Sequence, residues 1–243
     1  MAAFCTALGA VGYMHGYAGG SIFLTVGIFS ILLIMALWWR DIIREGTYMG
    51  FHTQVVQSML RFGILLFIVS EIMFFFSFFW AFFAASVSPT GAIGNEWPPH
   101  GVIPLDPFTI PLSNTLILLL SGVAVTWAHH AMLSKNRVDV ILGLCYTIGL
   151  GIIFTLCQIY EYLNASFQIN DGIFGTTFYM TTGFHGLHVL IGTIFLSVML
   201  YRQTLYHFTA THHVGLEGAI WYWHFVDVVW LFLYAFMYVW TYY

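Results

Sequence analysis

Residues 55–87 read VVQSMLRFGILLFIVSEIMFFFSFFWAFFAASV, and this stretch decides the fold. It contains two charged residues, Arg61 and Glu71, and is otherwise dominated by apolar side chains. As a helix it would be about 50 Å long, which exceeds the roughly 30 Å hydrocarbon core of a bilayer. We therefore expect a transmembrane helix that tilts or projects beyond the membrane.

The rest of the chain has the same character. Of its 243 residues, 60% are hydrophobic and 7% are charged, whereas a soluble domain carries about 25% charged residues. The first apolar run is the weakest, because Gly9, Gly12 and Gly16 interrupt it. The sequence predicts an all-α membrane protein, one integral-membrane domain over residues 1–243, with seven transmembrane helices at about residues 2–17, 21–39, 55–87, 112–133, 138–163, 173–201 and 216–240.

The basic residues divide the predicted connections into two classes. The connections at residues 87–111 and 164–172 carry no Lys or Arg. Cationic loops stay on the side from which a membrane chain is inserted, so we expect the N-terminus on the matrix or cytoplasmic side. The lack of a basic patch argues against nucleic-acid binding. All six basic residues flank connections of the other face: Arg40, Arg44, Arg61, Lys135, Arg137 and Arg202.

Glu71 is the sharpest candidate for chemistry. It lies ten residues beyond Arg61 and so about 15 Å further into the membrane, near the midplane. An ionised carboxylate is costly there, so we expect it to be protonated or paired with a polar group on another helix. Two readings stay open at this point: a proton-handling or conformational residue, and a neutral acid that joins two helices.

Histidines occur in several predicted helices. His185 and His188 are three residues apart and are predicted to share one helix face, and His224 and Asp227 repeat that spacing. Such residues could bind haem or a metal ion. The sequence has no Glu-x-x-His pair and no Cys–His cluster, so we interpret these four residues as structural polar groups and predict no metal site.

Two further acids and a pair of histidines lie near predicted helix ends. Glu161 and Glu217 are expected to be solvated at the membrane interface. His129 and His130 end the fourth predicted helix.

Charged and aromatic residues gather at the positive interface. Within residues 39–52 lie four such residues: Trp39, Arg44, Glu45 and His52. Arg202, at the end of the sixth predicted helix, should lie at the same depth in the membrane. They could be topogenic charges that snorkel to the interface. Because arginine binds phosphate bidentately, and Trp and His accompany these arginines, we favour a site for phospholipid head groups.

Several strings of the sequence resemble the mitochondrial form of the cytochrome c oxidase subunit 3 family. They occur in the family's order from about Leu37 to the end of the chain. The strings are Trp38–Asp41, Leu66–Phe76, Trp97–Pro99, Thr126–His130, Thr182–Val189 and Trp221–Trp230.

This resemblance implies more than composition can. It implies helices in two groups, one and two and then three to seven, forming a V-shaped cleft that holds phospholipid. It implies a non-catalytic core subunit without haem or copper, which would belong to subunits 1 and 2, and a main contact with subunit 1, whose stability and sustained proton uptake it supports. Glu71 matches the family's reactive buried glutamate. The implied location is the mitochondrial inner membrane, with a bacterial plasma membrane as the alternative.

Two other functions would also use these polar residues. An independent metal-binding membrane enzyme would use the histidines as ligands. A membrane transporter would use Glu71 and the charged interface, but broken helices and an internal repeat are typical of transporters. All six prolines instead lie in one predicted loop, at residues 89–111.

Overall fold

The computed structural model describes the backbone of residues 1–243 and every side chain except that of Ala92. The described chain is helical without named strands, and its one isolated β-bridge joins Thr209 and His212. This confirms the predicted all-α class. The principal helices are α1 (Ala2–Met14), α2 (Gly20–Thr47), α3 (Gln54–Val87), α4 (Ile110–Leu133), α5 (Arg137–Asn164), α6 (Gly172–Thr204) and α7 (Val214–Leu233). A π-helix, η2 (Tyr234–Val239), and the short α8 (Trp240–Tyr242) follow α7. A 3₁₀ turn, η1 (Gly91–Ile93), lies in the proline-rich loop.

Six of the seven principal helices are long and apolar enough to cross a membrane. The exception is α1, whose 13 residues span only about 20 Å. The predicted bounds differ most at α2, which continues to Thr47 rather than ending near residue 39. The last helix also differs, because its backbone changes from α to π geometry at Tyr234.

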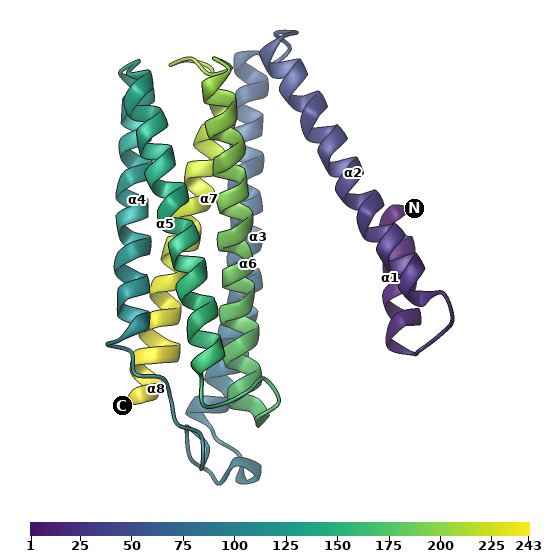
Figure 1. The fold of residues 1–243 in the computed structure, drawn as a ribbon, viewed down its shortest axis with the longest axis vertical. Helices are drawn as coiled ribbons and strands as arrows, with labels where there is room; N and C mark the ends of the chain where they lie inside the picture. Colours follow the sequence, from purple (N-terminus) through teal and green to yellow (C-terminus); the bar gives the residue numbers. More distant parts are fainter. The chain divides into compact units, whose positions relative to one another are not determined.

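The chain forms two compact units, Met1–Ser58 and Met59–Tyr243. In the first unit α1 and α2 form a helical hairpin (Figure 1). Their backbones approach closely through glycine: a Cβ on Gly9 would collide with the backbone of Leu24, and one on Gly27 would collide with Thr6. Gly9, which weakened the first apolar run in the sequence, therefore serves helix packing, whereas a Cβ on Gly16 would meet nothing within 4 Å.

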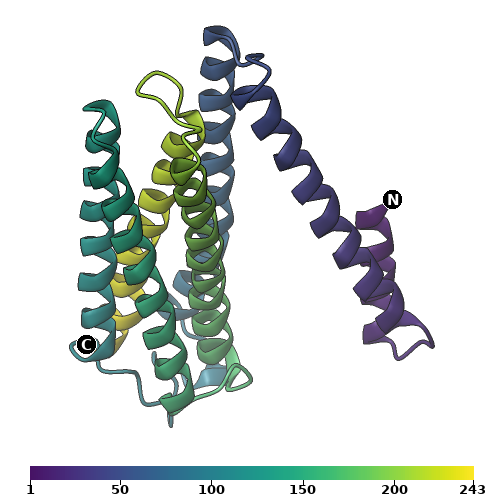
Figure 2. The ribbon, with the colours of Figure 1, turned by 45° about the horizontal axis from the view of Figure 1, so that its top comes forward.

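In the second unit four helices close a bundle. The contacts run from α4 to α5, from α5 to α6, from α6 to α7, and from α7 back to α4. The helices run along the same long axis, as both ribbon views show (Figures 1 and 2). The tight turn between α4 and α5 is stabilised by Asn136, whose side chain accepts a hydrogen bond from the backbone N–H of Asp139.

Two tryptophans of α7 fill the centre of this bundle. Trp223 and Trp230 are almost completely buried, and their indole N–H groups donate to Ser121 Oγ and Thr115 Oγ1 on α4, each at 2.9 Å. Trp223 fits because α5 and α6 present glycines to it: a Cβ on Gly151 or Gly192 would lie less than 3 Å from its ring. The hydrogen bonds remove the cost of burying the two indole donors.

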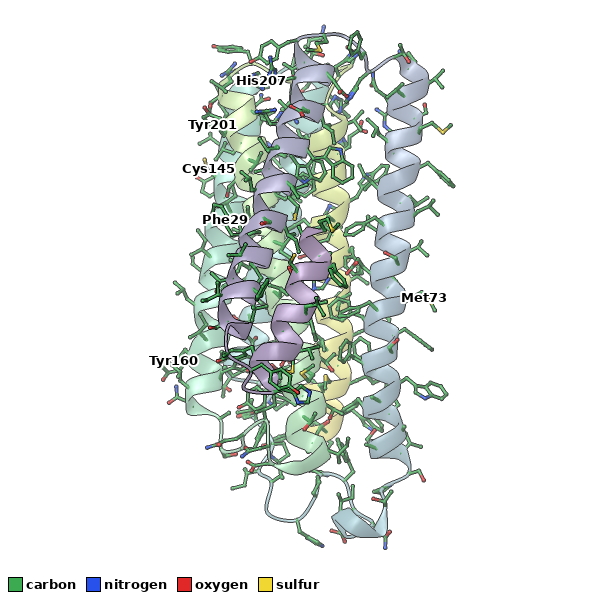
Figure 3. All side chains as sticks on the ribbon, turned by 90° about the vertical axis from the view of Figure 1, so that its right-hand side faces the viewer. Phe29, Met73, Cys145, Tyr160, Tyr201 and His207 are labelled. Atoms are coloured by element: carbon green, nitrogen blue, oxygen red, sulfur yellow. The ribbon has the colours of Figure 1, made fainter. Side chains whose placement is uncertain are left out.

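The second unit also contains most of α3, which joins the bundle through large aromatic side chains. Phe75 and Phe82 are buried, Phe75 packing on His188 with ring centroids 4.9 Å apart and Phe82 on Trp97 at 5.5 Å. The opposite side of α3 carries exposed apolar residues such as Met73, which points away from the bundle (Figure 3). A helix that is apolar on both sides is expected where one side faces lipid.

Candidate functional site

The carboxyl group of Glu71 on α3 meets the imidazole of His188 on α6. Glu71 Oε2 lies 2.7 Å from His188 Nε2, and their side chains are 22% and 10% exposed. Glu71 therefore has the polar partner on another helix that we expected, and His188 is that partner. His185, which was predicted to share a helix face with His188, bonds elsewhere. The two helices are thus joined by a polar contact inside an apolar region.

The protonation of this pair follows from the second ring nitrogen. His188 Nδ1 lies 2.6 Å from the backbone carbonyl oxygen of Phe184. A carbonyl only accepts, so Nδ1 carries a hydrogen and donates it. One further proton then lies between Nε2 and Oε2, either on the carboxyl group or on an imidazolium ring. The pair is electrically neutral in both cases, which is the arrangement that a membrane interior tolerates.

Aromatic rings enclose the imidazole. Phe74, Phe75 and Tyr222 have ring centroids 5.9, 4.9 and 6.3 Å from that of His188. Such a shell keeps the surroundings apolar and strengthens the hydrogen bond, because the local dielectric constant is low.

The other predicted polar residues have separate contacts. His185 is 1% exposed; its Nε2 donates to the carbonyl oxygen of Val226 at 3.2 Å, and the ring packs on Trp230. His224 Nδ1 lies 3.7 Å from Asp227 Oδ2, while its Nε2 is 3.2 Å from Thr126 Oγ1 on α4. His185 therefore joins α6 to α7 and His224 joins α7 to α4, whereas the contact of Asp227 with His224 lies within α7.

The predicted lipid-binding residues fall in both units. In the first unit Trp39, Arg44 and Glu45 are exposed in the last turns of α2. His52 is half-buried, with its ring against Gly46. These residues thus leave a cationic and aromatic surface at the end of α2.

In the second unit Arg202 ends α6, with its guanidinium over the ring of Phe208, 4.3 Å from the centroid. Burial and the charge of Arg202 lower the pKa of His207, which lies in the following loop (Figure 3). His207 is therefore mainly neutral at pH 7, and Arg202 supplies the cation here.

The expectation that Glu161 is solvated at the membrane interface is wrong. It is 3% exposed, and its Oε1 accepts hydrogen bonds from Tyr238 Oη at 2.7 Å and from Gln158 Nε2 at 3.2 Å. Tyr238 belongs to η2 and covers the end of α5. The sequence predicts that Glu161 lies at the membrane interface, but Tyr238, 77 residues further along the chain, covers it.

The expectation that Glu217 is solvated at the membrane interface is also wrong. Its carboxylate pairs with Arg61, with Nε 2.6 Å from Oε2 and Nη2 3.2 Å from Oε1. The side chain of Glu217 is only 14% exposed. Arg61, interpreted as a topogenic charge, therefore ties the start of α3 to the first turn of α7.

Among the described residues, one group of three side chains could hold a metal ion: His129, His213 and Glu217, whose ligand atoms all lie within 4.8 Å of one another. This group was not predicted from the sequence. The spacing of four residues between His213 and Glu217 was a usable signal, since a helix that begins just after His213 brings these two side chains close together. The addition of His129 from α4 was not visible in the sequence.

Comparisons with known proteins agree on one family. A family profile described as cytochrome c oxidase subunit III matches residues 1–242. The chain is similar to "Cytochrome c oxidase subunit 3" of Prototheca wickerhamii, with 58% identity over 98% of this chain and 91% of the relative. It is 57% identical to the protein of the same name from Chondrus crispus, over 99% and 88% of the two chains, and 56% identical to that of Myxine glutinosa, over 98% and 90%.

Proposed function

Since the chain belongs to the cytochrome c oxidase subunit 3 family and is a multi-pass membrane subunit of that oxidoreductase complex, we propose that it is a non-catalytic core subunit. It supports the stability of subunit 1 and sustains proton uptake by the complex. The single observation that carries this proposal is the family match, which extends over residues 1–242.

Electron transfer belongs to the partner subunits in this proposal. Haem a and copper are held there, and this chain carries no redox centre. The two histidines of α6 make contacts within the protein: both ring nitrogens of His188 make hydrogen-bonding contacts, and His185 donates to a backbone carbonyl. These contacts support a role in joining helices rather than in holding a redox metal.

Subunit 1 is the main proposed partner, with further contacts to other oxidase subunits. We place the chain in the mitochondrial inner membrane with its N-terminus on the matrix side. The placement is supported by the basic residues of the second unit: Arg61 lies near the start of α3, Lys135 and Arg137 lie at the α4–α5 turn, and Arg202 ends α6. Successive helices that alternate in direction bring these positions to one end of the bundle.

Phospholipid is the proposed ligand of two charged surfaces, one in each unit. Trp39, Arg44, Glu45 and His52 offer it a cation, hydrogen-bonding groups and an aromatic ring at the end of α2, and Arg202 offers a guanidinium at the end of α6. A guanidinium binds a phosphate group bidentately, so arginine suits such a head group better than lysine does.

The proposal is tested by assembling the oxidase with and without this chain. We expect the complex that lacks it to retain its haem and copper and its initial rate of electron transfer. It should lose activity faster during continuous turnover, because proton uptake is no longer sustained. If the complex without this chain contains less haem or copper than the intact complex, this chain holds a redox centre. If its activity lasts as long during turnover as that of the intact complex, the proposed role in sustaining proton uptake is contradicted.

A further inference from the structure

We propose that His129, His213 and Glu217 form a binding site for a divalent cation of the zinc class, at the end of the second unit where the basic residues lie. The ligand atoms of the three side chains all lie within 4.8 Å of one another. His129 comes from α4, His213 precedes α7, and Glu217 lies in the first turn of α7. The inference is independent of the proposed role in the oxidase.

His213 is oriented as a metal ligand. It is 4% exposed, and its Nδ1 lies 2.9 Å from the backbone carbonyl oxygen of Thr209. That carbonyl can only accept, so Nδ1 carries a hydrogen, and the neutral form of the ring then presents the electron pair of Nε2 to a metal ion. Metal-binding histidines are typically held in this way, by a bond from the other ring nitrogen to a carbonyl group.

The free electron pair of His213 faces the carboxylate of Glu217. Nε2 is 3.2 Å from Oε1, yet the described protein atoms offer Nε2 no partner in hydrogen-bonding geometry. A neutral imidazole nitrogen and a carboxylate oxygen at this distance repel each other unless a cation lies between them. Two ligands of a tetrahedral zinc ion are about 3.3 Å apart when each bond is about 2.0 Å long, so the observed spacing suits zinc.

Arg61 holds the carboxylate in place for this role. Its Nε contacts Oε2 of Glu217 at 2.6 Å, whereas the contact of Nη2 with Oε1 is longer, at 3.2 Å. Oε1 is therefore the oxygen available to a cation. Carboxylates that bind a metal ion are commonly hydrogen-bonded by an outer-shell group, which is the place of Arg61 here.

His129 supplies the third ligand. Its ring centroid is 5.8 Å from that of His213, and its side chain is half-buried, so the site is accessible from the surface. Three protein ligands leave a fourth tetrahedral position for water. A bound ion would join the end of α4 to the start of α7, while Arg61 adds the start of α3 to the same network.

The donor set selects the class of ion. Two imidazole nitrogens and one carboxylate suit zinc and its neighbours among the transition metals, whereas Ca²⁺ and Mg²⁺ require more oxygen ligands. The nearby guanidinium of Arg61 offsets the charge of the carboxylate, and this disfavours the hard cations further because their binding depends most on ligand charge.

The test measures zinc bound by the purified oxidase complex. The complex is treated with EDTA, equilibrated with defined free Zn²⁺, and its zinc content is determined per mole of complex. His129→Gln and His213→Gln remove a ligand each. His130→Gln and His212→Gln are matched controls, because each is the exposed sequence neighbour of a ligand.

We expect the wild type to bind about one more zinc equivalent than either ligand variant, with an affinity at least about tenfold higher at that site. The two control variants should match the wild type. Equal zinc binding by the ligand variants, or an equal loss in the controls, would overturn the proposal and leave only an ion pair between Arg61 and Glu217.

A second measurement covers the case in which a ligand variant fails to assemble. Anomalous scattering at the zinc absorption edge from the zinc-saturated wild-type complex should place a peak about 2.0–2.2 Å from His129, His213 and Glu217. The absence of that peak at saturating zinc contradicts the site. Co-purification with the oxidase is scored separately, so failure of the zinc site leaves the proposed subunit role intact.

Discussion

Glu71 Oε2 and His188 Nε2 lie 2.7 Å apart on two different helices, and the carbonyl of Phe184 fixes the hydrogen of the imidazole on its other nitrogen. The pair therefore shares one proton and is neutral. The sequence left two interpretations of Glu71 open, and this contact supports both. The acid joins α3 to α6, and the proton of the contact can lie on either residue.

Glu71→Gln should assemble and pump protons like the wild type. The amide N–H of glutamine can donate to His188 Nε2 in place of the carboxyl group, and no continuous series of polar side chains leads away from Glu71 along α3. The proton-to-electron ratio of the reconstituted complex checks this. A fully assembled Glu71→Gln complex with impaired pumping would show that the shared proton takes part in transfer.

Glu71→Ala should instead destabilise the complex, because His188 Nε2 is left without its partner in an apolar shell. An unsatisfied buried polar group costs about 1–3 kcal/mol. Ser70→Ala is the matched control, since Ser70 is exposed and bonds only to Phe67 of its own helix. Thermal denaturation in detergent measures the difference, and equal midpoints for the two variants would contradict the role of the pair.

Arg202→Ala should lower the phospholipid that remains with the purified complex. A charge-assisted contact with a phosphate group contributes about 1.5–3 kcal/mol, and alanine removes it. Quantitative lipid mass spectrometry checks the loss. Arg40→Ala is the control, because Arg40 is exposed and already paired with Asp41 at 2.8 Å. Unchanged lipid content and stability in the Arg202 variant would count against the site.

Tyr238→Phe should destabilise the complex by about 1–3 kcal/mol, because the buried carboxyl group of Glu161 loses its shortest hydrogen bond. Tyr242→Phe, at an exposed tyrosine near the same end of the chain, should have little effect. Thermal unfolding of the two complexes tests the comparison. A Tyr238→Phe complex as stable as the control would mean that Gln158 satisfies Glu161 alone.

Gly151→Ala should cost about 1–3 kcal/mol through overpacking, because its Cβ would lie 2.7 Å from the ring of buried Trp223. Gly149→Ala is an exact chemical match two residues away, where a Cβ meets nothing within 4 Å. The first variant should lower the thermal midpoint and the second should preserve it. Similar midpoints for both would show that Trp223 can move aside at little cost.

The topology can be tested by labelling single cysteines with a membrane-impermeant maleimide. We expect Lys135→Cys to react from the matrix side and His100→Cys to react from the opposite side, because basic connections are retained where the chain is inserted. Both positions are exposed. Labelling of the two positions from the same side would refute the proposed orientation.

Features that depend on order along the chain can be predicted from the residues alone. Long apolar runs predict spanning helices because every backbone polar group must be satisfied inside a bilayer. The placement of Glu71 near the midplane follows from counting residues from Arg61, and the strings around Trp38–Asp41 and Trp221–Trp230 indicate the family.

The contacts between side chains of different helices became known from the fold. Helices that are apolar nearly all round, such as α3, carry little periodic signal that distinguishes a lipid-facing side from a protein-facing side. The partnership of Glu71 with His188, 117 residues away, therefore could not be read from the sequence. The burial of Glu161 under Tyr238 and the meeting of His129 with His213 and Glu217 have the same cause, because each depends on how helices far apart in the chain are rotated against one another.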